Sequence, residues 1–216
     1  MDQNQEDRQA WLQLGEALAI GFANSKHATS DTAAWQKAYE LDPTDCHTGA
    51  LAARSLARAE AERCIRELRL HHPKCPEALY LSSLVLPGSG DVQIQMLQDS
   101  IAVKKSAEAL VALGQERIRA HDWKHAIEEF AAALDAPALF PEDWRPDGWA
   151  TVHARLGLAW CHYSRGALRS ARREYEEFMG VFSAPGPWHD LSQEEEGWRN
   201  TLTAQWPNIT GVQGNE

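Results

Sequence analysis

The sequence has 216 residues, of which 31 are acidic and 21 are basic, so its formal net charge is −10. Nonspecific binding to nucleic acids depends on Lys and Arg side chains that neutralise phosphates, so this balance argues against a nucleic-acid-binding protein. The same charge disfavours attachment to anionic lipid surfaces. The length is sufficient for one domain with a continuous core.

The apolar content and the cysteine count predict a cytoplasmic protein. Residues 1–7 lack the basic and apolar regions of a secretory signal. No apolar run approaches the roughly 20 residues that a bilayer-spanning helix needs, so we expect no membrane insertion. Four cysteines are too few for a disulfide framework, and we therefore expect reduced thiols.

Helix signals and turn signals alternate along the whole chain. Ser30 or Asp31 can cap a helix that Asp42-Pro43 ends, and Pro87-Gly88-Ser89-Gly90 marks a turn after which Asp91 can cap the next helix. Residues 45–70 contain no turn residue near their centre, so they form either two helices or one long helix. The pattern predicts helices over about 5–22, 31–41, 45–70, 77–86, 92–103, 106–120, 122–135, 151–163, 168–181 and 192–205.

One arrangement of residues recurs along these helices. Its clearest copy has Gly114 in the first helix, Asp122-Trp123 at the turn, Ala126 and Phe130 in the second helix, and Pro137 at the end. A small residue lets the first helix approach the second, an aromatic residue fills the space between neighbouring hairpins, and proline ends the unit. The small residue recurs 34 residues apart early in the chain and again later, at Gly15, Gly49, Ser83, Gly114 and Gly157.

This arrangement resembles the tetratricopeptide (TPR) repeat, which has a period of 34 residues. The resemblance implies an all-α fold, a right-handed superhelical solenoid of about five helical hairpins with a C-terminal capping helix. It places a repeat array over residues 1–183, a linker and capping helix over 184–207, and a disordered tail over 208–216. The repeat units are 8–43, 44–75, 76–105, 106–138 and 150–183, and an insertion rich in Pro, Asp and Trp interrupts them at 137–149.

The last predicted helix has the features of a solenoid cap. Ser192 and Glu195 have the spacing of a capping box, in which each side chain satisfies a backbone N–H of the other residue. Trp198, Leu202 and Trp206 share one face because they lie four residues apart. This face is expected to cover the last hairpin.

No catalytic or metal-binding motif stands out in the sequence. His71, His72 and Cys75 are close together but lack a fourth ligand in phase, and the end of a repeat explains them better. His121 and His125 lie four apart, but His121 falls in the expected turn between two helices. We therefore predict no enzymatic activity, no metal site and no cofactor.

In TPR proteins the first helix of each hairpin lines a concave groove, and the resemblance carries that role to the matching positions. The partner-binding residues predicted in this groove are Tyr80, Leu84, Val111, Gln115, Ile118 and Leu158. Trp144 and Trp149 in or beside the insertion are further candidates, unless the insertion packs on itself. Glu16, Glu77 and Glu108 surround the apolar positions and would favour a partner with basic flanks.

The resemblance implies a scaffold or adaptor that binds a protein or peptide through apolar anchors, and one form of this function is an assembly or secretion chaperone. Two alternatives remain open. The chain could be a non-catalytic regulatory subunit that docks onto an enzyme. It could also be a self-assembling structural protein, since TPR arrays can form homo-oligomers through their terminal faces.

Overall fold

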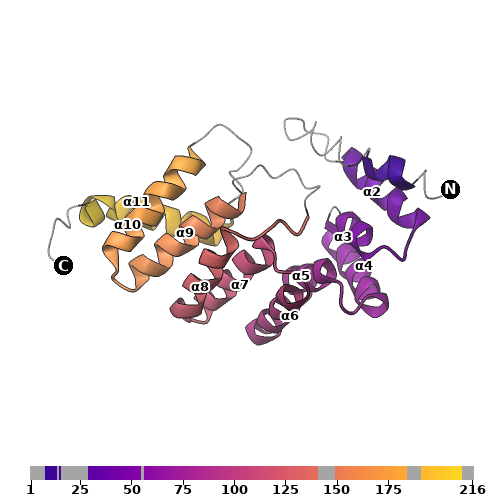
Figure 1. Cartoon of the computed structure of the whole chain (residues 1–216), viewed down its shortest axis with the longest axis horizontal. Helices are drawn as coiled ribbons and strands as arrows, with labels where there is room; N and C mark the ends of the chain where they lie inside the picture. Colours follow the sequence, from indigo (N-terminus) through magenta and orange to yellow (C-terminus); the bar gives the residue numbers. More distant parts are fainter. Residues whose placement is uncertain are drawn as a thin grey trace. The chain divides into compact units, whose positions relative to one another are not determined.

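The computed structural model describes residues 8–13, 15, 29–54, 56–140, 149–183 and 191–210. Within these ranges the regular secondary structure is entirely helical, and successive helices run as antiparallel pairs (Figure 1). This confirms the predicted all-α solenoid fold. The chain divides into two compact units, Met1–Lys105 with Ala138–Trp144, and Ser106–Pro137 with Arg145–Glu216.

The first unit contains five helices with described bounds. They are α2 (Thr29–Leu41), α3 (Cys46–Arg54), α4 (Arg58–His71), α5 (Pro76–Val85) and α6 (Gly90–Val103). Residues 8–13 and 15 are also helical. The chain over 45–70 therefore forms two helices, α3 and α4, and the possibility of one long helix is wrong. Helix α3 packs against α2, α4 and α5.

The second unit contains two further hairpins and a final helix. The hairpins are α7 (Ala107–Arg119) with α8 (Trp123–Ala133), and α9 (Trp149–Ser164) with α10 (Leu168–Phe182); α11 is Gln193–Thr210. Helix α9 packs against α7, α8 and α10, and α11 packs against α9 and α10.

Outside residues 45–70, most helix ends with described bounds lie within two residues of their predicted positions. Helix α2 begins at Thr29, before Ser30, and α6 begins at Gly90 with Ser89 in the N-cap position, so Asp91 lies in the first turn. An acidic residue there still favours the positive end of the helix dipole. Helix α11 continues to Thr210, beyond the expected end at residue 205.

A phenylalanine ring joins the two hairpins of the second unit, as the repeat pattern predicts. Phe130 of α8 is fully buried. A Cβ atom added to Gly114 of α7 would lie 2.8 Å from this ring, and one added to Gly157 of α9 would lie 2.5 Å from it. The two glycines therefore make room for one aromatic ring from both sides.

The same pairing of glycine with an aromatic residue occurs in the first unit. A Cβ atom on Gly15 would lie 2.3 Å from Trp35 of α2, and one on Gly49 of α3 would lie 2.8 Å from Tyr39. At the third position Ser83 is buried, and its hydroxyl donates to the Tyr80 carbonyl at 2.6 Å.

The two inter-helix turns of the second unit have the same hydrogen bonds. His121 has a positive φ of 57°, and its N–H donates to the Ile118 carbonyl while the Asp122 N–H donates to the Arg117 carbonyl. This is the Schellman arrangement that ends many helices. Its presence confirms that His121 lies in a turn rather than on a helix face.

Gly166 occupies the equivalent place after α9. Its φ is 75°, its N–H donates to Tyr163, and the Ala167 N–H donates to the His162 carbonyl.

Candidate protein-binding surfaces

In the first unit, a short segment from the predicted insertion lies against the first helices of two hairpins, α3 and α5. Leu139 and Phe140 belong to no helix, yet they are 0% and 2% exposed. The Phe140 ring stacks with His47 at 5.9 Å between centroids and lies 6.3 Å from the Tyr80 ring. The Arg54 guanidinium carbon lies 4.4 Å from the same centroid, in cation–π geometry. His47, Arg54 and Tyr80, which we call the Phe140 pocket, thus enclose an aromatic ring.

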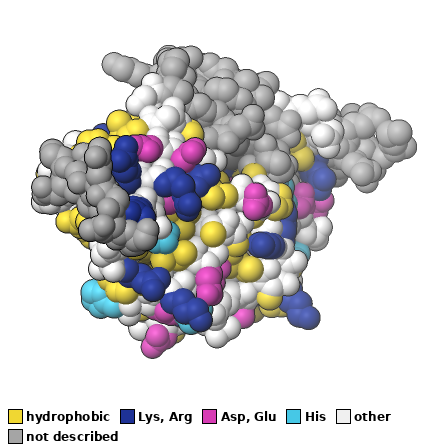
Figure 2. Space-filling view, turned by 60° about the vertical axis from the view of Figure 1, so that its left-hand side comes forward, with side chains coloured by type: hydrophobic (Ala, Val, Ile, Leu, Met, Phe, Trp, Pro, Cys, Tyr) yellow, Lys and Arg dark blue, Asp and Glu magenta, His cyan; other side chains and the backbone are white. Residues whose placement is uncertain are grey.

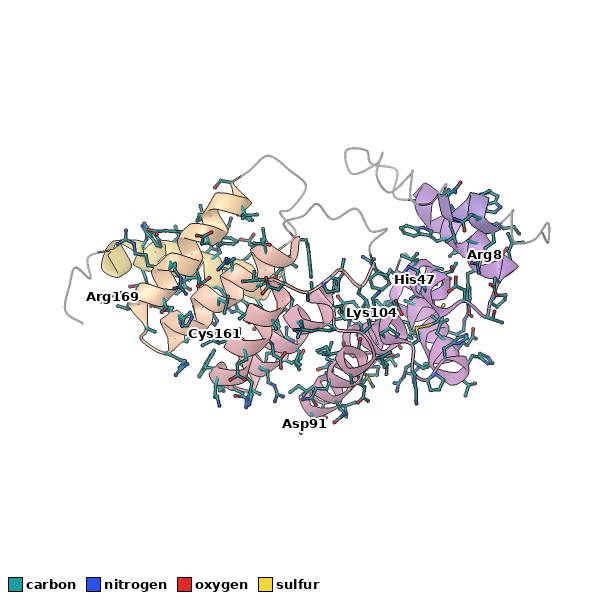
Figure 3. The ribbon with its side chains drawn as sticks, in the orientation of Figure 1. Arg8, His47, Asp91, Lys104, Cys161 and Arg169 are labelled. Carbon is teal, nitrogen blue, oxygen red and sulfur yellow. A yellow bond between two sulfur atoms is a disulfide. The ribbon has the colours of Figure 1, made fainter. Side chains whose placement is uncertain are left out.

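Polar groups beside the Phe140 pocket also hold the main chain of this segment. Lys104 Nζ donates to the Leu139 carbonyl at 3.2 Å. The buried Glu77 carboxylate lies 3.1 Å from His47 Nδ1 and 3.9 Å from Lys104 Nζ (Figure 3 labels His47 and Lys104). Glu77 therefore pairs with His47 and Lys104 of this chain, and its predicted role toward a basic partner stays a prediction.

A disulfide bond joins Cys46 and Cys75, with their Cα atoms 6.4 Å apart. The expectation that all four cysteines are reduced is therefore wrong for this pair. Cys46 begins α3, and Cys75 is the N-cap of α5, where its sulfur accepts from the Ala78 N–H. The pairing arises because stacked hairpins bring the starts of successive first helices together, which a sequence separation of 29 residues does not reveal.

The two remaining cysteines, Cys64 and Cys161, are free. Burial raises the pKa of the Cys64 thiol, and it raises that of Cys161 to about 12. Thiols with raised pKa values are poor nucleophiles and poor metal ligands at neutral pH, because the reactive species is the thiolate. Cys75 is not available as a thiolate, since its sulfur is in the disulfide.

In the second unit, the start of α11 binds polar groups of α7 and α9. Glu195 is buried, with 1% of the residue exposed. Its Oε1 accepts from Gln115 Nε2 at 2.9 Å and lies 2.6 Å from His153 Nδ1. Glu194 accepts from Arg119 Nη2 at 2.8 Å. Gln115, a predicted partner-binding residue, is thus engaged by the chain's own helix.

The capping box of α11 is present as predicted. The Ser192 N–H donates to the Glu195 carboxylate at 2.8 Å, and the Glu195 N–H donates to the Ser192 hydroxyl at 3.2 Å. Burial raises the pKa of the Glu195 carboxyl, but the hydrogen bonds from His153 and Ser192 outweigh it and hold this pKa below its ordinary value. The carboxylate is therefore the charged form that the site stabilises.

The apolar face of α11 covers the last hairpin. Trp198 and Leu202 are buried, and the Trp198 ring stacks with Trp160 of α9 at 6.1 Å. Trp206 lies 5.1 Å from the Tyr175 ring of α10. The predicted capping helix is confirmed.

The predicted partner-binding residues fall into two groups. Tyr80 and Leu84 lie on α5 in the first unit, where Tyr80 is 8% exposed and Leu84 is 53% exposed. The second unit contains Gln115 and three buried apolar residues, Val111, Ile118 and Leu158. A groove that uses both groups stays a prediction.

The structure describes one of the two tryptophans of the insertion. Trp144 and residues 141–148 lie outside the described residues. Trp149 begins α9, is half-buried, and places its ring 4.4 Å from that of His153.

The sequence did not predict the roles of four residues in or beside the Phe140 pocket: His47, Arg54, Lys104 and Phe140. The single signal available was an apolar pair, Leu139-Phe140, in a stretch otherwise rich in polar and turn residues. His47, Arg54 and Lys104 belong to no recognisable motif, because they are far from Phe140 in the sequence.

The described outer surface mixes side-chain types. On the face drawn in Figure 2, hydrophobic, basic and acidic side chains alternate over short distances among the described atoms. The exposed large hydrophobic residues include Leu70 and Leu84, which come from different helices. In the part of the chain that the structure describes, no helix has both the length and the apolar character needed to cross a membrane.

Solved structures with a similar fold are found for almost the whole chain. PilF of Pseudomonas aeruginosa has a TM-score of 0.61 at 15% identity, covering 98% of this chain and 96% of that chain. Two crystal structures of MamA each have a TM-score of 0.51, at 14% and 15% identity, and cover 87% and 85% of this chain and 98% and 96% of theirs. Both proteins are built from TPR repeats, so the resemblance is confirmed for the fold. No protein-family model matches the sequence, and no curated protein matches it.

Proposed function

We propose that this protein is a TPR-type scaffold that binds an extended protein segment on the first-helix face of its hairpins. The observation that carries the proposal is the Phe140 pocket, where α3 and α5 enclose an aromatic ring of the chain's own segment and Lys104 binds a main-chain carbonyl of the same segment. A surface that holds one such segment has the chemistry to hold another: aromatic and basic side chains around a ring, and a donor for the backbone.

A non-catalytic role agrees with how the polar groups of the second unit are used. His153 and Glu195 are the kind of buried pair that can serve in acid–base chemistry. Here they contact each other at 2.6 Å and fix α11 against α9. We therefore propose a structural role for this pair, in which Glu195 positions the cap rather than a substrate.

Two exposed leucines of the first unit allow a matched test of the binding face. Leu84 lies on α5, a first helix, and is 53% exposed, whereas Leu70 lies on α4, a second helix, and is 78% exposed. A charge at either exposed position should cost less folding stability than a charge at a buried groove residue such as Ile118. Leu84→Glu should reduce capture of a stoichiometric partner from the native host about tenfold or more, because truncated or charged anchors in an interface core are costly.

Leu70→Glu serves as the control and should leave capture unchanged. Circular dichroism and thermal melts of both variants should match those of the wild type. Equal capture by the two variants would show that the first-helix face near Leu84 does not bind the partner, and the proposal would be wrong for this face.

A further inference from the structure

We infer that the Phe140 pocket is a docking site for a partner segment in which an aromatic residue is followed by acidic residues, and that the chain's own residues 138–140 compete for it. This inference rests on the proposed function and names the chemistry of the partner. Its first support is the burial of Leu139 and Phe140. Residues in a connection between two helices are usually exposed, but these two are almost completely buried in the first unit.

We expect the surface that holds this segment to form without it, as a binding site for a ligand does. The walls of the pocket come from two helices, since His47 and Arg54 belong to α3 and Tyr80 to α5. The disulfide between Cys46 and Cys75 ties together the starts of these two helices, next to His47 and five residues before Tyr80, so it restrains this part of the pocket without the segment. We therefore expect removal of Phe140 to leave a pocket for a ring.

The charge of the pocket selects the sequence around the aromatic residue. His47, Arg54 and Lys104 contact the segment, and the Glu77 carboxylate lies 3.1 Å from His47 Nδ1 and 3.9 Å from Lys104 Nζ. The chain continues from Phe140 with Pro141, Glu142 and Asp143. A partner with the same order, an aromatic residue and then acidic residues, matches both the ring site and the basic side chains around it.

The chain's own segment lowers the apparent affinity for such a partner. A short tether gives an intramolecular ligand an effective concentration in the millimolar range. The pocket is then accessible only for a fraction of the time, and the apparent dissociation constant rises in inverse proportion to that fraction. Vacating the pocket should therefore tighten binding.

The test uses a fluorescein-labelled peptide with the sequence of residues 137–144 and measures its fluorescence anisotropy with the full chain under non-reducing conditions. Phe140→Ala should bind this peptide about tenfold or more tightly than the wild type does. Phe182→Ala removes an aromatic ring of the second unit and is the matched control, with the affinity of the wild type. Arg54→Ala added to Phe140→Ala should weaken binding again, and a peptide with alanine in place of its phenylalanine should bind neither protein.

Three results would overturn the inference. The first is equal affinity of the wild type and Phe140→Ala for the peptide. The second is that the alanine-substituted peptide binds Phe140→Ala as tightly as the unsubstituted peptide does. The third is a wild-type dimer, seen by light scattering, that Phe140→Ala abolishes, because the occupant of the pocket would then be a second copy of this chain. If Phe140→Ala does not fold, Phe140→Leu should give a smaller tightening in the same direction. Because the peptide needs no natural partner, its result is independent of the Leu84 capture experiment, and the two proposals can fail separately.

Discussion

The hairpins α7–α8 and α9–α10 make the same turn with different residues. Each first helix ends with a residue of positive φ and the same two hydrogen bonds, but that residue is His121 in one hairpin and Gly166 in the other. A positive φ is unfavourable for residues with a Cβ, so histidine adopts it at a cost that glycine does not have. The same turn therefore forms with or without a Cβ at this position, and we expect the residue there to change the stability of the turn rather than its hydrogen bonds.

The residue after each turn residue is the N-cap of the next helix, and here the α7–α8 hairpin has the more favourable residue. Asp122 caps α8, since its carboxylate accepts from the His125 N–H, whereas Ala167 has no side-chain group to cap α10. One hairpin thus combines an unfavourable turn residue with a good cap, and the other combines a favourable turn residue with none.

The largest expected effect concerns what the hairpins share, the Phe130 ring. Leucine in place of Gly114 or Gly157 should destabilise the protein by on the order of 1–3 kcal/mol, because either side chain would overlap the ring. Gly157 should be the more sensitive position, since its approach is 2.5 Å against 2.8 Å for Gly114. Denaturant unfolding measures both. Gly180→Leu on α10 is the control: nothing lies within 4 Å of its Cβ position, so better helix propensity should make it neutral or stabilising.

The next effect separates the two turn residues. Gly166→Ala should cost about 1–2 kcal/mol, because alanine at a φ of 75° meets the steric penalty of the left-handed region. No atom lies within 4 Å of the Cβ position, so the loss would come from the backbone alone. A thermal melt identical to that of the wild type would mean that this turn relaxes to another conformation.

The cap should contribute less than the turn. Asp122→Ala should cost about 1 kcal/mol at neutral pH, as removal of an N-cap usually does. Burial raises the pKa of this carboxyl, but hydrogen bonds from His125 and the charge of Arg117 hold it below its ordinary value. The stabilisation is then complete above the ordinary Asp pKa of about 3.9 and is lost as the pH falls through the lower pKa of the folded state.

Stability curves of Asp122→Ala and wild type against pH measure this cap. The two curves should converge below pH 4, and a constant difference between them down to acidic pH would contradict a role for the ionised carboxylate. The reciprocal variant, Ala167→Asp, supplies the missing cap to α10 and should raise stability, by no more than about 1 kcal/mol.

The smallest effect is expected at His121. His121→Gly should stabilise the α7–α8 hairpin by about 0.5 kcal/mol, because the steric relief at φ 57° is partly offset by the greater freedom of glycine in the unfolded chain. The comparison with Gly166→Ala fixes the sign: one variant should gain stability and the other should lose it. Loss of stability in both variants would show that the His121 side chain makes a favourable contact that exceeds the strain.

The parts of the fold that depend on local patterns could be predicted from the sequence. The repeat pattern predicted that an aromatic residue fills the space between neighbouring hairpins, where Phe130 meets Gly114 and Gly157, and the spacing of Ser192 and Glu195 predicted the start of α11. The Cys46–Cys75 bond could not be predicted, since it depends on the stacking of two hairpins. The Phe140 pocket was missed for the same reason, as its ring and its walls come from segments roughly 60 to 90 residues apart.

The disulfide makes the unfolded state of the two units unequal. The bond closes a loop of 29 residues in sequence separation that contains the whole of α3 and α4. In the chain-entropy model, closing a loop of this length removes about 3–4 kcal/mol of conformational freedom from the unfolded chain. The second unit has no such restraint among its described residues, since its Cys161 is free. The stability of the first unit therefore depends on the redox poise of its surroundings, and the packing, caps and hydrogen bonds of the second unit do not.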